Sequence, residues 1–301
     1  MRKCLFVAAI IVGSSVLAPD VSLADKFVFN PPDGITYKET ATMTRSKDMG
    51  SFGKQVDKSE QFMDVRIQRT PEGYNILSTL RDMTFTRDGQ KITEPFLTAM
   101  LGISMEYQLD PLGYIQDITG LAAVLDKMLA SMPDLPPTVK QVLSEDALKN
   151  KSMTEYNGRI GDFIGKTFEI GDVWSTESEF TLPDGTTIDY LSVIRFKSME
   201  PCGQTRCVRV EYVYDADPAT LKNFVQDIYD ELDPAVKQNL EKLTVTETRI
   251  NGSGTRLIDP ATMLIYDEEL NRTISVPMAL PEQGKIPVVM TETRVYQFDY
   301  E

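Results

Sequence analysis

Residues 103–132 read ISMEYQLDPLGYIQDITGLAAVLDKMLASM, and this stretch indicates the design of the fold. Apolar and polar residues alternate from Ile103 to Leu109, which is the period of a half-buried strand. Asp110-Pro-Leu-Gly113 predicts a tight turn into a return strand at Tyr114–Ile118, because proline fixes φ and glycine accepts a positive φ. The apolar period then becomes helical, which predicts a sheet with a helix laid across it. The apolar face of that helix consists of Leu121, Val124, Leu125, Met128, Leu129 and Met132.

Alternating strands are predicted on both sides of this stretch. Residues 45–59 have little apolar content and predict a long hairpin loop or frayed strand ends. Strands resume at Thr167, and Asn251-Gly-Ser-Gly254 predicts a hairpin loop between two of them. The strands of the first group are predicted at residues 35–43, 63–67, 74–80, 83–86 and 91–92, joined mostly by short turns.

Further helical segments are predicted, and two of them begin at a cap signal. One begins at the cap Ser144 and continues through Met153, Tyr156 and Ile160. The other begins at Asp217, with Pro218 in its first turn. Its apolar face repeats the spacing of the first helix: Leu221, Phe224, Val225, Ile228, Tyr229 and Leu232. We predict one α+β domain, residues 25–301, in two strand-rich halves (about 25–165 and 166–301), whose curved antiparallel sheet wraps two or more inserted amphipathic helices.

The first 24 residues predict a cleavable signal peptide. Arg2 and Lys3 precede an apolar run too short to span a membrane, and Ser22-Leu-Ala24 offers small residues before the expected cut. No later stretch reaches the apolar length of a membrane helix. We therefore expect an exported protein, periplasmic or secreted, without an integral membrane segment after cleavage.

The net charge is strongly negative, with 45 acidic against 31 basic residues and a formal charge of −14. Such a chain is repelled by phosphate backbones and anionic lipid surfaces, so we expect no nucleic-acid partner and no polybasic membrane contact. Cys202 and Cys207 are the two cysteines beyond the predicted signal, and their spacing fits a bridge across a hairpin. Half of a metal site or a redox pair is the alternative for this spacing.

Catalytic signals are weak. The chain has no histidine, which removes the commonest general base and the Ser-His-Asp triad. A carboxylate-pair hydrolase could use Asp267, Glu268 and Glu269, or Asp227, Asp230 and Glu231, yet these acidic runs are typical of solvated surface. We therefore expect no enzymatic activity, no catalytic residue, no bound metal and no cofactor.

Methionine is the most informative residue type for function. Soft, unbranched side chains suit either an ordinary core or a surface that accepts variable apolar groups. The second interpretation predicts a cleft for a lipid or acyl chain between the sheet and the two amphipathic helices. Its candidate lining residues are Met43, Met63, Met83, Met105, Tyr107, Leu121, Val124, Leu125, Met128, Met132, Leu221, Phe224, Val225 and Ile228.

Export, a long meander, inserted helices and Asp-Pro hairpins together resemble the half-barrel envelope proteins of the LolA/LppX type. Ile170-Gly-Asp-Val-Trp174 and Leu182-Pro-Asp-Gly185 also resemble an uncharacterised family of exported bacterial β-proteins. The first resemblance implies a curved sheet with an apolar cavity for acyl chains. This chain is longer than typical carriers and lacks an acyl-anchor cysteine. We expect a binding protein for an apolar ligand or a lipidated partner. The alternative is an envelope interaction or scaffold protein with a filled core, which binds through strand edges.

Overall fold

The computed structural model describes residues 25–50, 53–93, 100–131, 144–161, 163–181, 187–221, 244–245, 248–280 and 284–301. The predicted signal peptide lies outside these residues. Within the described residues, the helices with defined bounds are α2 (Leu121–Ser131) and α4 (Glu145–Gly161). The strands are β1 (Asp25–Lys26), β2 (Thr36–Asp48), β3 (Lys54–Thr70), β4 (Gly73–Arg87), β5 (Gln90–Lys91), β6 (Ser104–Leu109), β7 (Ile115–Thr119), β8 (Thr167–Phe168), β9 (Val173–Thr181), β10 (Thr187–Cys202), β11 (Thr205–Ala216), β12 (Thr244–Val245), β13 (Arg249–Ile258), β14 (Ile265–Leu280) and β15 (Gly284–Tyr300).

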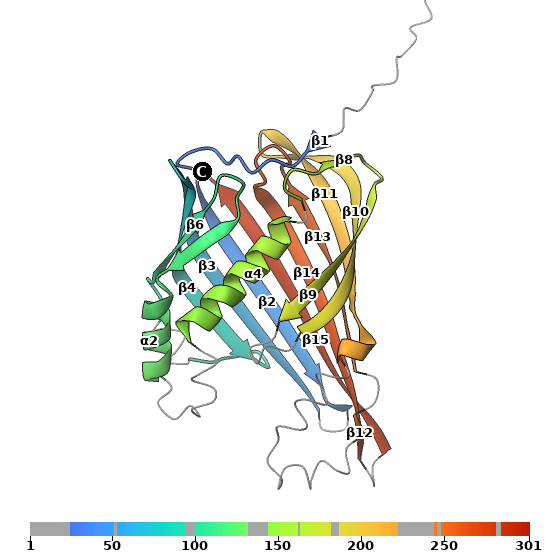
Figure 1. The fold of residues 1–301 in the computed structure, drawn as a ribbon. Coiled ribbons are helices and arrows are strands. Elements are labelled where there is room, and N and C mark those ends of the chain that lie inside the picture. The colour runs from blue at the N-terminus through green and yellow to red at the C-terminus, as the bar shows by residue number, and fades with distance from the viewer. Residues whose placement is uncertain are drawn as a thin grey trace, which may run out of the picture.

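One thirteen-stranded antiparallel sheet dominates the molecule. Its main order is β7-β6-β4-β3-β2-β15-β14-β13-β11-β10-β9, while β5 adds to β4 and β12 adds to β14. The long strands β2 and β15 pair through the middle, from Tyr37 opposite Tyr300 to Asp48 opposite Val289, so both strand groups share one sheet. The sheet is curved and open, as Figure 1 shows, which confirms the predicted fold class.

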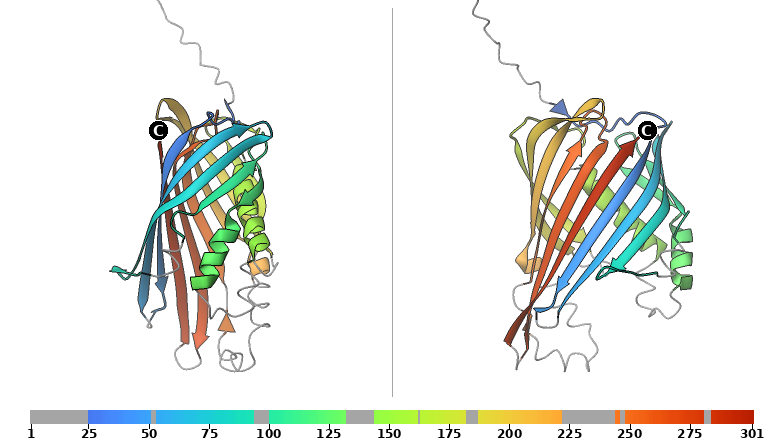
Figure 2. Two further views of the ribbon diagram at one scale, coloured as in Figure 1. Left: turned by 90° about the vertical axis from the view of Figure 1, so that its left-hand side faces the viewer. Right: turned by 180° about the vertical axis from the view of Figure 1, so that it is seen from behind.

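The helix that lies across the concave face is α4, whereas α2 lies beside the sheet edge next to β7 (Figure 1). The expectation that Leu121–Met132 crosses the sheet was therefore wrong. Only Gly120 separates β7 from α2, so the chain has no length in which to turn back over the strands. Figure 2 shows that the opposite, convex face carries neither α2 nor α4. Among the described residues, no helix has the length and apolar content to cross a membrane.

The caps predicted for the other two helices are present. The Ala147 backbone N–H donates to Ser144 Oγ at 3.2 Å at the start of α4. Asp217 Oδ1 accepts from the backbone N–H groups of Ala219 and Thr220, and Leu221 behind them is buried. The rest of the helix predicted after Asp217, residues 222–232, lies outside the described residues.

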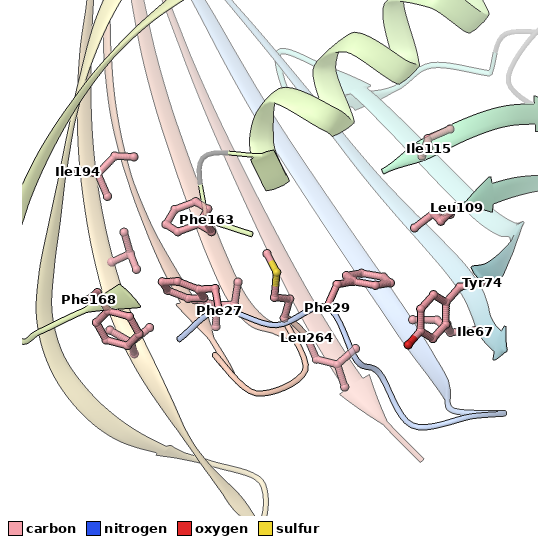
Figure 3. Close-up of a cluster of buried hydrophobic side chains, with 14 of the residues drawn as sticks. Phe27, Phe29, Ile67, Tyr74, Leu109, Ile115, Phe163, Phe168, Ile194 and Leu264 are labelled. Carbon is pink, nitrogen blue, oxygen red and sulfur yellow. The ribbon is translucent and has the colours of Figure 1, made fainter. Parts of the chain in front are cut away.

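An aromatic core closes one end of the curved sheet (Figure 3). Phe27, which is fully buried, stacks on Phe168 at 4.7 Å and meets Phe163 edge-on at 5.1 Å. Phe29 packs against Gly113, where an added Cβ would clash with the Phe29 ring. That contact, together with a φ of 96°, explains why glycine occupies the turn after Asp110. The segment 27–30 thus seals this end.

Two predicted loops are strands instead. β2 continues to Asp48 and β3 begins at Lys54, so most of residues 45–59, predicted as a long hairpin loop or frayed strand ends, form regular pairs such as Arg45 with Asp57. β13 runs unbroken through Gly252 and Gly254, which were predicted to form a hairpin loop. In both places cross-strand partners overrode a weak local signal, since β propensity depends on neighbouring strands.

Cys202 and Cys207 form the predicted disulfide at the tip of the β10–β11 hairpin, with a Cα–Cα separation of 5.7 Å. Cys207 is fully buried. The predicted bridge between this pair is therefore confirmed. No group of potential metal ligands occurs within the described part of the chain.

Candidate functional site

The concave face can be read from strand register. Tyr37 and Tyr300 pack on the core from the inner side, and neither β2 nor β15 contains a bulge. Side chains alternate between faces along a strand, so every second residue from these tyrosines points inward. On β2 and β15 these are Glu39, Ala41, Met43, Arg45, Phe298, Tyr296, Arg294 and Glu292.

Four of the candidate methionines share this inner face. Met43 lies on β2, Met63 on β3, Met83 on β4 and Met105 on β6, and Tyr107 stands two residues beyond Met105. All five side chains are only half-buried. They therefore form an apolar surface that the described helices leave partly open.

The helical candidates are placed differently. Leu121, Val124 and Leu125 are buried and Met128 is half-buried, but α2 packs beside α4 at the sheet edge. Leu221 is buried. Met132, Phe224, Val225 and Ile228 lie outside the described residues. Their role in lining a ligand site remains a prediction.

A hollow of about 560 Å³ lies beside this face, near the other edge of the sheet. Trp174, Thr176 and Ile194 line it from β9 and β10, and Lys166 also lines it, with its ammonium group 5.5 Å from the Trp174 ring centroid. Trp174 also packs against Phe196 of the aromatic core at 4.4 Å. The sealed core thus borders open space on its inner side.

A row of charged side chains crosses the concave face from strand to strand. Cross-strand pairing sets Arg272 of β14 opposite Glu292 of β15, Glu292 opposite Arg45 of β2, and Arg45 opposite Asp57 of β3. Glu292 is 4% exposed and accepts from Arg45 at 2.6 Å, Arg272 at 3.0 Å and Arg294 at 2.9 Å. We call Arg45, Arg272, Arg294 and Glu292 the arginine cluster.

The carboxylate of this cluster is ionised. Burial would raise the pKa of Glu292, but the hydrogen bond from Arg45 and the charges of Arg294, Arg272 and Arg45 outweigh it, so that its pKa lies below 4.5. The three guanidinium groups keep a third or more of their side-chain surface exposed. Three positive charges therefore surround one negative charge.

A second ion pair lies deeper on the same face. Arg256 donates to Glu268 at 2.5 Å, and both are almost fully buried. Tyr212 donates to the same carboxylate at 3.3 Å, and the Arg256 guanidinium lies over the Phe163 ring. Asp267, the next residue along β14, points to the convex face and binds Arg209. Two of the carboxylates considered for hydrolysis, Asp267 and Glu268, therefore lie on opposite faces.

Glycines in β13 make room for tyrosine rings on this face. Gly252 lies opposite Tyr214, and a Cβ there would come within 2.5 Å of the Asn271 carbonyl oxygen as well as meeting the Tyr214 ring. At Gly254 a Cβ would meet Tyr212 and the Glu269 carbonyl oxygen in the same way. Glycine within a strand typically marks such a close approach.

Sequence reasoning missed the arginine cluster. Arg45 fell in a predicted loop, and Arg272 belongs to a strand whose inward face cannot be identified without its partners. One signal was available on β15, where Thr291-Glu-Thr-Arg294 continues the alternation of Tyr296, Phe298 and Tyr300 and so places both charges on the inner face.

No family model and no curated protein matches the chain. Similar solved structures include lipovitellin, with a TM-score of 0.45 and 11% identity over 90% of this chain and 26% of that chain. A proposed lipoprotein from Parabacteroides distasonis has a TM-score of 0.27 and 9% identity, covering 93% and 100%. A proposed exported protein with a YmcC-like fold from Bacteroides fragilis has a TM-score of 0.22 and 11% identity, covering 92% and 99%.

This chain spans about a quarter of the length of the lipovitellin chain. None of these three structures is described as a LolA or LppX protein, so that resemblance stays a prediction. At such identities and TM-scores, function has to be argued from the concave face itself.

Proposed function

We propose that this protein is an exported binding protein that holds an apolar ligand, a lipid or an acyl chain, against the concave face of its sheet. It acts by binding rather than by catalysis, in the periplasm or outside the cell. A lipidated protein could present the same acyl chain. This proposal keeps the function expected from the methionine pattern but relocates the site away from α2.

The observation that carries it is the contrast between the two parts of the concave face. At the closed end, Phe27, Phe168 and Phe196 are sealed to 2% exposure or less. On β2, β3 and β4 of the same concave face, Met43, Met63 and Met83 remain half-buried. Partly exposed apolar side chains grouped on one face are typical of binding surfaces, because water contact with them is unfavourable.

The rival is a scaffold protein that binds through strand edges. β7 is a poor candidate for such an edge, because Asn157 of α4 donates to the Ile115 carbonyl at 3.1 Å and accepts from its N–H at 2.8 Å. The side chain thereby occupies groups that an added strand would need. β9, at the other end of the main strand order, is the edge that the scaffold alternative would use.

A matched pair of variants on β4 separates the two functions. Met83→Lys puts a charge on the concave face, and Thr84→Lys puts it on the convex face of the same strand. Binding of a pyrene-labelled fatty alcohol is followed by fluorescence. We expect Met83→Lys to weaken binding by about tenfold or more, because the probe must desolvate the ammonium group, and Thr84→Lys to leave binding unchanged. Absence of probe binding to the unmodified protein would contradict the proposed function.

A further inference from the structure

The arginine cluster has more positive charge than its structural role requires. Glu292 Oε2 accepts from Arg45, and its Oε1 accepts from both Arg272 and Arg294. One carboxylate thus meets three cations, in a chain whose formal net charge is −14. The electrostatic potential at this inner surface is therefore positive, although that of the whole protein is negative.

Neighbouring groups do not cancel this excess. Asp57, next in the row after Arg45, binds Arg87 at 2.9 Å. Glu268 lies on β14 closer to the closed end than Arg272, and its carboxylate accepts hydrogen bonds from Arg256 and Tyr212. Counting Arg45, Arg87, Arg272 and Arg294 against Asp57 and Glu292 leaves an excess of two positive charges along the row.

The guanidinium groups also retain donors and access. A guanidinium carries five N–H donors, and Arg272 uses one of them on Glu292. The exposed side-chain fractions of Arg45, Arg272 and Arg294 are 39%, 34% and 40%. Glu292 holds one side of the three guanidinium groups in place, and the other side of each group stays accessible. Guanidinium groups held in this way form a preorganised anion-binding surface.

Apolar side chains adjoin the row. Met43 lies directly opposite Arg294, and Tyr296 and Phe298 continue toward the closed end. Arg45 is eight residues along β2 from Tyr37, or roughly 26 Å at the usual strand rise. An extended chain could therefore lie along the strands with a charged end at the row and its apolar part on the methionines.

Resting on the proposed function, we propose that the arginine cluster binds the anionic headgroup, a carboxylate or phosphate, of an amphiphile whose apolar tail lies on the concave face. The guanidinium groups of Arg272 and Arg294 donate to the headgroup oxygens, while Glu292 holds them in place. The ligand class is thereby narrowed from apolar molecules in general to anionic amphiphiles.

The test compares two pyrene probes of equal length, a fatty acid and the corresponding fatty alcohol, on the purified protein at pH 7.5. We expect the acid to bind about tenfold more tightly at low salt, because the guanidinium groups donate charged hydrogen bonds to its carboxylate. Water screens these half-exposed groups and so limits the gain to about that size. Added salt should reduce this preference. Equal binding of the two probes would overturn the anion site while leaving the proposed function intact. Failure of both probes would overturn the proposed function and this inference with it.

Variants locate the effect. Arg272→Gln and Arg294→Gln should each remove most of the preference for the acid, by weakening acid binding far more than alcohol binding. The matched control is Arg209→Gln, since Arg209 also binds two carboxylates, Glu200 and Asp267, but on the convex face. Melting temperatures verify folding; Arg272→Lys, which keeps the charge, should retain part of the preference. An unchanged preference in both glutamine variants would contradict the assignment.

A last arm distinguishes the amphiphile from a free anion. Inorganic phosphate, titrated against the bound fatty acid probe, should compete only through general screening, with the same effect as an equal ionic strength of chloride. Displacement by phosphate at concentrations comparable to those of the fatty acid would show a site for a small anion and overturn the amphiphile.

Discussion

Single residues explain how a sheet accommodates bulky side chains on its inner face. Gly252 and Gly254 lie on β13 beneath the rings of Tyr214 and Tyr212. Their sequence, Asn-Gly-Ser-Gly, is typical of a turn, and only the partner strands β11 and β14 reveal that the glycines provide space. Local sequence could not show this, because the rings that need the space come from residues about forty positions earlier.

This account predicts that Gly252→Ala destabilises the fold. The new Cβ would approach the Asn271 carbonyl oxygen, a backbone atom that cannot move aside, to 2.5 Å. We expect the free energy of unfolding to fall by about 3 kcal/mol, as for other overpacked sites. Urea unfolding followed by Trp174 fluorescence measures it. Ser253→Ala, on the exposed face of the same strand, is the control and should change little; equal effects would contradict the close approach.

Glu292 should give the protein an acid-sensitive component of stability. Its pKa is lowered in the folded state, so this stabilisation is complete above pH 4.5 and is lost as pH falls through the lower folded value. Glu292→Gln should reduce the free energy of unfolding at pH 7 by about 2–3 kcal/mol, because three cations lose their shared partner. The difference from the unmodified protein should shrink toward pH 3.

The control for this titration is Glu301→Gln, which removes an exposed pair with Lys38 and should have little effect at any pH. A difference between Glu292→Gln and the unmodified protein that stays constant from pH 7 to pH 3 would show that the Glu292 charge does not stabilise the cluster.

At the scale of elements, α4 is the helix that lies across the concave face, and polar side chains attach it to the edge strand β7. Asn157 exchanges two hydrogen bonds with the backbone of Ile115, which is 1% exposed. Lys149 of α4 also pairs with Asp117 of β7. The apolar periodicity and the Ser144 cap predicted this helix. Its place across the sheet could not be predicted, since the stronger amphipathic pattern belongs to α2.

Asn157→Ala should therefore loosen α4. Both backbone groups of a buried residue would lose their partner, so we expect a loss of about 2–3 kcal/mol in the free energy of unfolding. Hydrogen exchange at the Ile115 amide should accelerate more than exchange in the central strands. Thr154→Ala, at an exposed position of the same helix, provides the comparison. Unchanged protection at Ile115 would refute the proposed attachment.

For the whole molecule, the antiparallel class and the Cys202–Cys207 bridge follow from patterns within the sequence. The pairing of β2 with β15 does not, because it joins residues more than 200 positions apart: Arg45 meets Glu292. That pairing creates both the continuous concave face and the arginine cluster. The part of the site built from methionines was accessible to sequence reasoning, whereas the charged part needed the register.

The central claim is that the concave face holds an apolar ligand, and native mass spectrometry of the protein purified from its own cells without detergent tests it most directly. The account predicts a population heavier than the polypeptide by a few hundred daltons, whose added mass is released on unfolding and recovered as an anionic amphiphile by solvent extraction. A single species at the polypeptide mass, which also fails to take up either pyrene probe, would contradict the account.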